Sequence, residues 1–198
     1  MYKEITGIII SDEEGAQSNF QLKLGDKSVI EHTKNLMTSL FERVIVISTK
    51  LEEYDFLGLE IFPQFFNGLG PLSSIHAGLF HTNTAQNFII PFNMSLMSQE
   101  MIKYIVDFKT DALITVAKAE GEVYQKVGMF AKKCFVPAEE ILKRYSNTDK
   151  QLPSCNVLRL MDAVGAHLIA ADLLPFYSSE IFFSINNYDN SANILQNA

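Results

Sequence analysis

The residues best suited to chemistry lie in segment 67–79, which reads NGLGPLSSIHAGL. Gly68 and Gly70 come just before Pro71, so the backbone there can take sharp or left-handed turns. Pro71 fits the first turn of a helix, where a missing N–H leaves no intrahelical hydrogen bond unmade. A glycine-rich loop that runs into a helix N-terminus offers backbone N–H groups to an anion. The segment therefore indicates a phosphate-binding loop.

A plainer interpretation of the same segment is a turn followed by an ordinary core helix. Leu72, Ile75 and Leu79 are spaced to share one buried helix face. Short glycine motifs also match by chance in unrelated chains. The spacing by itself leaves the anion site and the structural turn both open.

Three consecutive acids, Asp12, Glu13 and Glu14, form a second candidate site. Several carboxylates in one loop attract Ca²⁺ or Mg²⁺. The alternative is a solvated turn, which is the commoner role of a short charge run. A cation site and a solvated turn are the two interpretations of this loop.

The cysteines and histidines do not have the spacing of a metal site. Cys134 and Cys155 are far apart and neither belongs to a CxxC pair, which indicates structural thiols. The histidines have no HxxxH spacing, so each is expected to be partly exposed or hydrogen-bonded: His32, His76, His81 and His167.

Length, charge and hydropathy restrict the class of protein. The 198 residues fit one domain spanning 1–198, and 47% hydrophobic residues suffice for a sizeable core. A net charge of −7 argues against nucleic acid or a membrane surface as partner, but leaves a small anionic substrate open. There is no 18-residue apolar run and no signal-peptide pattern, so we expect a cytoplasmic protein.

Apolar runs alternate with helical patterns along the chain, which is typical of an α/β protein. The predicted strands are 5–11, 43–49, 59–62, 88–91, 112–117, 124–130, 166–170 and 181–185. The predicted helices are 28–40, a helix from 71, 98–108, 136–145 and 153–164, with a short final helix capped by Asn187. Segment 20–24 is expected to be a short extended piece, and 50–57 a loop or short helix.

This alternation predicts a mostly parallel sheet with helices on both faces. Residues beyond 120 are expected to add strands at an edge of that sheet. Ligands bind at the carboxyl ends of the strands in such sheets. The loops to inspect are therefore 11–19, 63–71 and 91–97.

Six segments, taken in order, resemble the molybdenum-cofactor guanylyltransferases of the MobA type. The most specific is GLGPLSSIHAGL, which is close to the family pattern GxGPLAGIxAGL. The segments are GIIIS (7–11), LGDKSVIEH (24–32), RVIVIS (43–48), GLGPLSSIHAGL (68–79), IIPFNMS (89–95) and FFSINNYDN (182–190). The resemblance covers nearly the whole chain.

The resemblance implies a Rossmann-like fold of the nucleotide-diphospho-sugar transferase type. It implies binding of GTP with Mg²⁺ and transfer of GMP to molybdopterin, with release of pyrophosphate. It places nucleotide binding at Ser11, Gly68, Gly70, Pro71 and Leu72. It also places substrate binding at Gln125 and Asn186, and metal binding at Asn93.

The sequence departs from the family pattern where charge is needed. The glycine-rich loop after the first strand is replaced by acids, and the family's essential lysine falls near Asn19. The metal-binding aspartate is replaced by Asn93, which is either a weakened ligand or a strand-end cap. Gln64 stands where the family has another aspartate. Lys126 stands where the family has the proline of a Gln-Pro pair, and Ser184 stands where it has an asparagine.

These departures predict reduced or lost catalysis and weak or lost Mg²⁺ binding. The alternative is a non-catalytic nucleotide- or molybdopterin-binding module, or a protein-interaction module of cofactor assembly. Phe62, Phe65 and Phe66 fit either a contact surface for a protein partner or simple core packing. His76 is expected on the flank of its helix.

Overall fold

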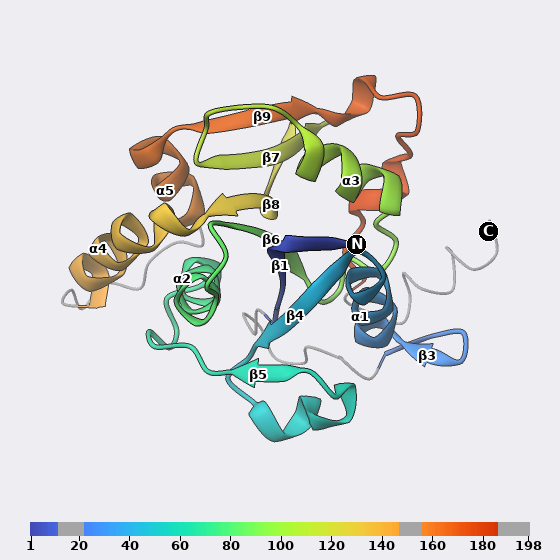
Figure 1. Cartoon of the computed structure of the whole chain (residues 1–198), viewed down its shortest axis with the longest axis horizontal. Helices are drawn as coiled ribbons and strands as arrows, with labels where there is room; N and C mark the ends of the chain where they lie inside the picture. Colours follow the sequence, from blue (N-terminus) through green and yellow to red (C-terminus); the bar gives the residue numbers. More distant parts are fainter. Residues whose placement is uncertain (12–21, 147–155, 186–198) are drawn as a thin grey trace.

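The computed structural model describes residues 1–11, 22–146 and 156–185. In these residues a seven-stranded sheet has the order β5-β4-β1-β6-β8-β7-β9, and a two-stranded ribbon joins β2 to β3 (Figure 1). The strands are β1 Tyr2–Ile10, β2 Lys23–Leu24, β3 Lys27–Ser28, β4 Phe41–Ile47, β5 Glu60–Phe62, β6 Gln86–Pro91, β7 Ile114–Ala119, β8 Glu122–Ala131 and β9 Ala166–Ala170.

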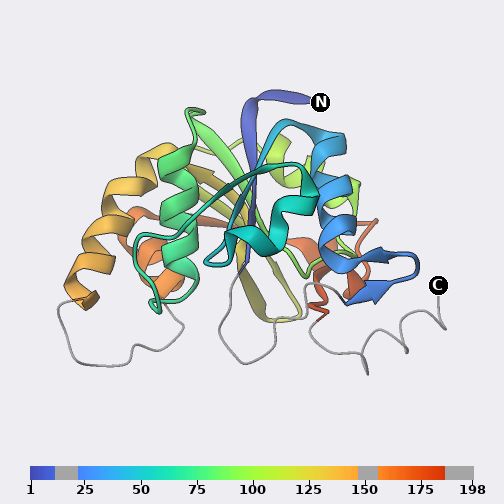
Figure 2. The same cartoon turned by 90° about the horizontal axis from the view of Figure 1, so that it is seen from below.

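Helices cover both faces of the large sheet (Figures 1 and 2). They are α1 Val29–Leu40, α2 Pro71–His81, α3 Gln99–Asp107, α4 Phe135–Ser146 and α5 Asn156–Val164, with 3₁₀ segments η1 Leu51–Leu57, η2 Lys132–Cys134, η3 Ala171–Leu173 and η4 Ser179–Phe182. One apolar layer packs α1 and α3 on the sheet, and the other packs α2, α4 and α5.

The central strand β1 shows why an uninterrupted apolar run was needed. It pairs in parallel with β4 and with β6. Ile9 packs into the layer of α1 and α3, whereas Ile8 and Ile10 pack into the layer of α2. Because side chains alternate between two covered faces, all three are fully buried.

Local signals set the helix starts as expected. Ser28 and Glu31 form a capping box at the start of α1, and the Ser98 hydroxyl accepts from Met101 N–H at the start of α3. Pro71 is the first residue of α2. The predicted parallel sheet with helices on both faces is confirmed.

The predicted place of the late strands is only half right. β9 does lie at the edge, paired in parallel with β7. β8, however, lies inside the sheet, antiparallel to both β6 and β7. The hairpin turn at 120–121 brings the chain back beside β7, so β8 fills the position next to β6.

The strand predicted at 181–185 is wrong. This stretch holds η4 and then irregular backbone, in which Ile185 N–H donates to Asn93 C=O at 3.0 Å. Ile181 and Phe182 are both buried against the layer of α3. Two adjacent residues on one side fit a tight turn, not a strand. Of segment 50–57, expected to be a loop or short helix, residues Leu51–Leu57 form the 3₁₀ helix η1. The final helix predicted at Asn187 lies outside the described residues.

Candidate functional site

The carboxyl ends of the parallel strands lie together at one end of the sheet, toward the lower side of Figure 2. Ser11 N–H donates to Ile47 C=O at 2.9 Å, which continues the ladder between β1 and β4. Phe92 N–H donates to Ile10 C=O at 3.0 Å on the other side of β1. The loops that follow β1 and β6 therefore start side by side, where ligands bind in such sheets.

The glycine loop runs into α2 as the sequence predicts. Gly68 and Gly70 have φ of 73° and 72°, which L-residues with a side chain rarely adopt. The Ser73 hydroxyl donates to Phe66 C=O, so the first turn of α2 holds the loop. Gly70 provides no side-chain cap. Pro71 has no N–H and Ser73 N–H donates to Gly70 C=O at 3.0 Å, so an anion at this helix start would meet the N–H of Leu72.

The side chains around this loop hold it in shape. Gln64 Nε2 donates to Ser74 Oγ at 2.7 Å, a structural contact at a position where the resemblance expects an acid. The side chain of Leu72 is fully buried in the core. Leu72 is a predicted nucleotide-binding residue, and only its backbone can therefore face a ligand.

Ser11 is buried at the end of β1. Its hydroxyl forms a 2.9 Å hydrogen bond with the hydroxyl of Tyr54, which is also fully buried. This contact joins the start of the loop after β1 to η1. The side chain of Ser11 therefore serves the packing of this edge, and its contact with a nucleotide remains a prediction.

A cavity of about 310 Å³ opens where β6 ends. It brings together Asn93 and Gln125, two residues that the sequence singles out from distant segments. Ser11 and the glycine loop do not line it. Asn186 lies outside the described residues. The lining is Pro91, Asn93, Met94, Glu122, Val123, Tyr124, Gln125, Lys126, Val127, Phe182 and Ser184.

Two features of the cavity indicate a ligand. Gln125 Oε1 is buried and accepts no hydrogen bond from any described residue, which is costly unless a ligand or water donates to it. Tyr124 and Phe182 stack with ring centroids 4.1 Å apart and form an aromatic wall. Burial, with Glu120 and Glu122 nearby, raises the pKa of Tyr124, so this wall stays uncharged.

The described lining fits a Mg²⁺ ion poorly. It offers one carboxylate, Glu122, beside the neutral oxygens of Asn93, Gln125 and Ser184. Across residues 1–11, 22–146 and 156–185, no group of three His, Cys, Asp or Glu could hold a metal. Mg²⁺ prefers carboxylates. The acids Asp12, Glu13 and Glu14, for which a cation site and a solvated turn were the two interpretations, lie outside the described ranges.

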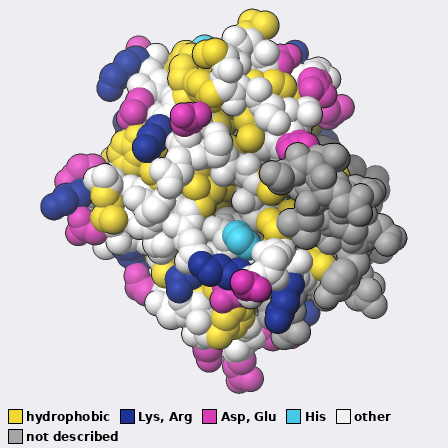
Figure 3. Space-filling view, turned by 90° about the vertical axis from the view of Figure 1, so that its right-hand side faces the viewer, with side chains coloured by type: hydrophobic (Ala, Val, Ile, Leu, Met, Phe, Trp, Pro, Cys, Tyr) yellow, Lys and Arg dark blue, Asp and Glu magenta, His cyan; other side chains and the backbone are white. Residues whose placement is uncertain are grey.

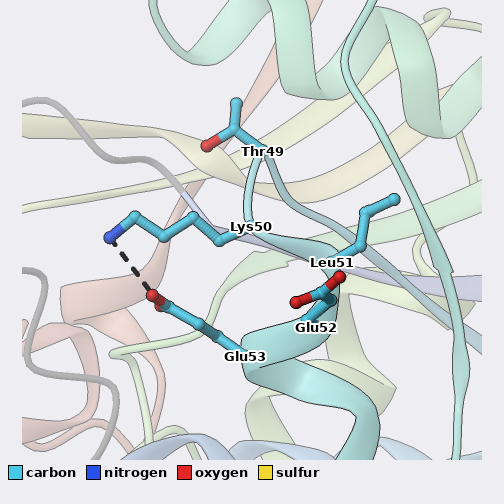
Figure 4. Close-up of a pocket in the computed structure, with 5 residues that line it drawn as sticks. All are labelled: Thr49, Lys50, Leu51, Glu52 and Glu53. Atoms are coloured by element: carbon cyan, nitrogen blue, oxygen red, sulfur yellow. Dashed lines mark ion pairs between the residues drawn. The ribbon is translucent and has the colours of Figure 1, made fainter.

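A second cavity, of about 410 Å³, lies at the carboxyl end of β4 (Figure 4). It is lined by Thr49, Lys50, Leu51, Glu52 and Glu53. Lys50 Nζ lies 3.7 Å from Glu53 Oε2. Sequence reasoning missed this cavity, although the loop after β4 starts at the same edge as the others and the carboxyl-end rule applies to it.

The prediction that His76 lies on a helix flank is wrong. His76 is 2% exposed, and neither ring nitrogen has a hydrogen-bond partner among the described residues. Its ring stacks on Phe135 and meets Phe65 and Phe66 edge-on. A glycine loop rich in phenylalanine folds over this face of α2, which buries the histidine.

The phenylalanines divide between core packing and exposure, and a contact surface for a protein partner stays a prediction. Phe62 and Phe66 pack partly buried against the core, whereas Phe65 is 48% exposed. Phe65 and Phe80, also exposed, lie with ring centroids 4.9 Å apart. Aromatic surface therefore remains beside the glycine loop.

The remaining candidates are structural. Burial raises the pKa of the Cys134 thiol to about 11, as expected of a structural thiol, and Cys155 lies outside the described residues. His32 Nε2 is 2.7 Å from Leu24 C=O.

No described helix has the length and apolar character needed to cross a membrane. Figure 3 shows basic and acidic side chains close together on the face that carries α1 and β3.

Comparisons with known proteins find a matching family model and similar relatives. Residues 16–154 match the family model of the MobA-like NTP transferase domain. A probable molybdenum cofactor guanylyltransferase of Flavobacterium johnsoniae is 29% identical over 161 residues, covering 81% of this chain and 77% of the relative. One of Clostridium perfringens strain 13 is 27% identical over 115 residues, covering 58% of this chain. That match spans only 57% of the length of the relative.

Solved structures show the same fold. The molybdopterin-guanine dinucleotide biosynthesis protein A of Archaeoglobus fulgidus superposes with a TM-score of 0.76 at 14% identity, over 100% of both chains. The 4-diphosphocytidyl-2C-methyl-D-erythritol synthase of Anaerococcus prevotii gives 0.70 at 11% identity, over 97% of this chain and 96% of the other. The predicted nucleotide-diphospho-sugar transferase-like fold is confirmed.

Proposed function

Because this chain belongs to the MobA-like NTP transferase domain family, we propose that it binds GTP and molybdopterin in the biosynthesis of molybdopterin guanine dinucleotide, and that its transfer of GMP is reduced or lost. The names of the relatives in Flavobacterium johnsoniae and Archaeoglobus fulgidus support this pathway. The acidic net charge of −7 argues against nucleic acid and membrane surfaces as partners, and we expect the protein to act in the cytoplasm.

The transfer itself defines what the site must supply. An oxygen of the molybdopterin phosphate attacks the α-phosphorus of GTP, the bond to the bridging oxygen of the β-phosphate breaks, and pyrophosphate leaves. Negative charge that develops on the phosphates must be met by N–H donors and cations. The backbone N–H of Leu72, in the first turn of α2, is one such donor.

The observation that carries the proposal is the pair of Asn93 and Gln125 in one cavity. Gln125 Oε1 is buried and has no hydrogen-bond partner in the described part of the chain, which supports a retained ligand site. Asn93 gives this site a neutral amide where the resemblance expects a carboxylate. A cavity with a neutral amide at this position supports binding with weakened catalysis.

The experiment measures binding and transfer separately. Calorimetric titration with GTP tests binding, and conversion of GTP to molybdopterin guanine dinucleotide tests transfer, with the Flavobacterium johnsoniae relative assayed in parallel for comparison. We expect micromolar GTP binding and transfer at least about 100-fold slower than in the relative. Transfer at the rate of the relative contradicts the loss of catalysis, and absence of GTP binding overturns the proposal.

A second candidate function is a protein-interaction module of cofactor assembly. The exposed aromatic pair Phe65 and Phe80 beside the glycine loop favours it, since exposed aromatic side chains are enriched at interfaces. This function predicts that the purified chain binds no GTP. It also predicts that substitution of both residues by serine abolishes binding to the protein partner.

A further inference from the structure

The cavity at the end of β6 contains a lysine that the function above does not use. We propose that Lys126 binds a phosphate group of the substrate there, and that this binding needs no divalent cation. The inference rests on the proposed function, because it takes the ligand to be a nucleotide or a phosphorylated acceptor. The ligand class is therefore a phosphate ester or a polyphosphate.

Strand register explains why Lys126 lies in the cavity. Gln86 pairs with Ala131 and Ile89 with Gly128, so the pairing runs in opposite directions along β6 and β8. Continued by two residues, it would set Pro91 opposite Lys126. The pairing ends at Ile89 and Gly128, and both Pro91 and Lys126 line the cavity. The cavity thus opens where the two strands part.

The charges of the lining favour an anion. Glu122 is exposed at the start of β8, whereas Lys126 is only partly exposed. Both residues line the cavity, and solvent screens an exposed charge more than a partly buried one, so we expect a bound ligand to experience the charge of Lys126 more strongly than that of Glu122. The neutral Asn93 adds no negative charge that would oppose a phosphate.

The neighbouring groups complete an anion site of mixed donors. The amide of Asn93 and the hydroxyl of Ser184 line the same cavity and can donate to phosphate oxygens. Gln125 Oε1 is a buried acceptor and suits a hydroxyl or N–H of the same ligand. Charge-assisted hydrogen bonds from Lys126 then take over the role of a cation in neutralising the phosphate.

The test uses the whole chain with two probes, inorganic pyrophosphate and GTP, each titrated with EDTA and with Mg²⁺. We expect the wild type to bind both probes in EDTA. Lys126→Gln should weaken binding about tenfold or more, because it removes charged hydrogen bonds. Lys126→Arg should restore most of the affinity. Lys118→Gln removes the same charge from an exposed position on β7 outside the cavity, and should bind like the wild type.

A converse variant tests the role of Asn93. Asn93→Asp should weaken pyrophosphate binding in EDTA and make it respond to added Mg²⁺, because it adds a carboxylate to the lining. Thermal unfolding of each variant shows whether it is folded.

Several results would overturn the inference. Wild-type binding that disappears in EDTA, or Lys126→Gln binding like the wild type, excludes Lys126 as the phosphate-binding cation while leaving the proposed function intact. Binding of pyrophosphate without GTP overturns the proposed function alone. Binding of neither probe overturns both.

Discussion

His76 stacks on Phe135, with ring centroids 4.6 Å apart and planes 19° apart, and neither of its ring nitrogens has a hydrogen-bond partner among the described residues. Burial is the main cause that lowers the pKa of His76, and Lys143 lowers it further, whereas Glu139 opposes the shift. The imidazole is therefore neutral at pH 7 in an aromatic environment, where an apolar ring would serve packing better.

Replacing this histidine should stabilise the protein. His76→Phe keeps an aromatic ring against Phe135 and removes two buried nitrogens without partners, so we expect a gain of about 1 kcal/mol in the free energy of unfolding at pH 7. Urea denaturation measures it. His76→Ala is the matched control, and should destabilise by about 2–4 kcal/mol because it leaves a cavity.

The same pair of variants gives a pH signature. The folded pKa of His76 lies below its unfolded value near 6.5, so the unfolded chain binds the proton more readily. Stability is thus kept above pH 6.5 and falls as the pH is lowered below it. The advantage of His76→Phe over the wild type should widen between pH 7 and pH 5, and an advantage independent of pH contradicts the argument.

The hydroxyl pair of Ser11 and Tyr54 should be coupled energetically. Each single variant, Ser11→Ala or Tyr54→Phe, leaves a buried hydroxyl without this partner, at a cost of about 1–3 kcal/mol. The double variant should lose less than the sum, with a coupling of about 0.5–3 kcal/mol in a double-mutant cycle. Additive losses would show that the contact at the end of β1 contributes nothing.

Gly128 should be irreplaceable in β8. A Cβ atom there would lie 2.1 Å from Thr115 O, a backbone atom that cannot move without disrupting β7. We expect Gly128→Ala to destabilise by more than about 4 kcal/mol or to prevent folding. Gly7→Ala is the comparison, since its closest contact is Met37 Cε, the end of a flexible side chain. Equal stability losses in thermal unfolding would contradict this distinction.

Gly70 connects the backbone of the loop to ligand binding. With φ 72° and ψ −165° it occupies a region that is almost restricted to glycine. Gly70→Ala should cost about 1–3 kcal/mol of stability. It should also weaken GTP binding roughly tenfold by shifting the N-terminus of α2.

Gly165 provides the control for that variant. It also has positive φ, but it lies between α5 and β9, at the opposite edge of the sheet from the glycine loop. Gly165→Ala should lose stability and keep its GTP affinity in the same calorimetric titration. An equal loss of affinity in both variants would mean that stability, not the loop conformation, controls binding.

The sequence by itself determined those features that depend on neighbours in the chain. The apolar run of β1 required two covered faces, and Ser28, Ser98 and Pro71 fixed where three helices begin, since capping acts within one turn. The order of the motifs also identified the family, and the strand–helix alternation predicted a ligand site at the carboxyl ends of the strands. Asn93 and Gln125 were named as site residues on that basis.

Only the tertiary structure decided the features that join distant segments. Local pattern could not show that β8 enters the sheet beside β6, because hydrophobic alternation does not specify the partner of a strand. That pairing is what puts Lys126 beside Asn93 in one cavity. The burial of His76 likewise depends on Phe135, a residue from α4. Side chains acquire these surroundings through packing between elements, which no single stretch of sequence specifies.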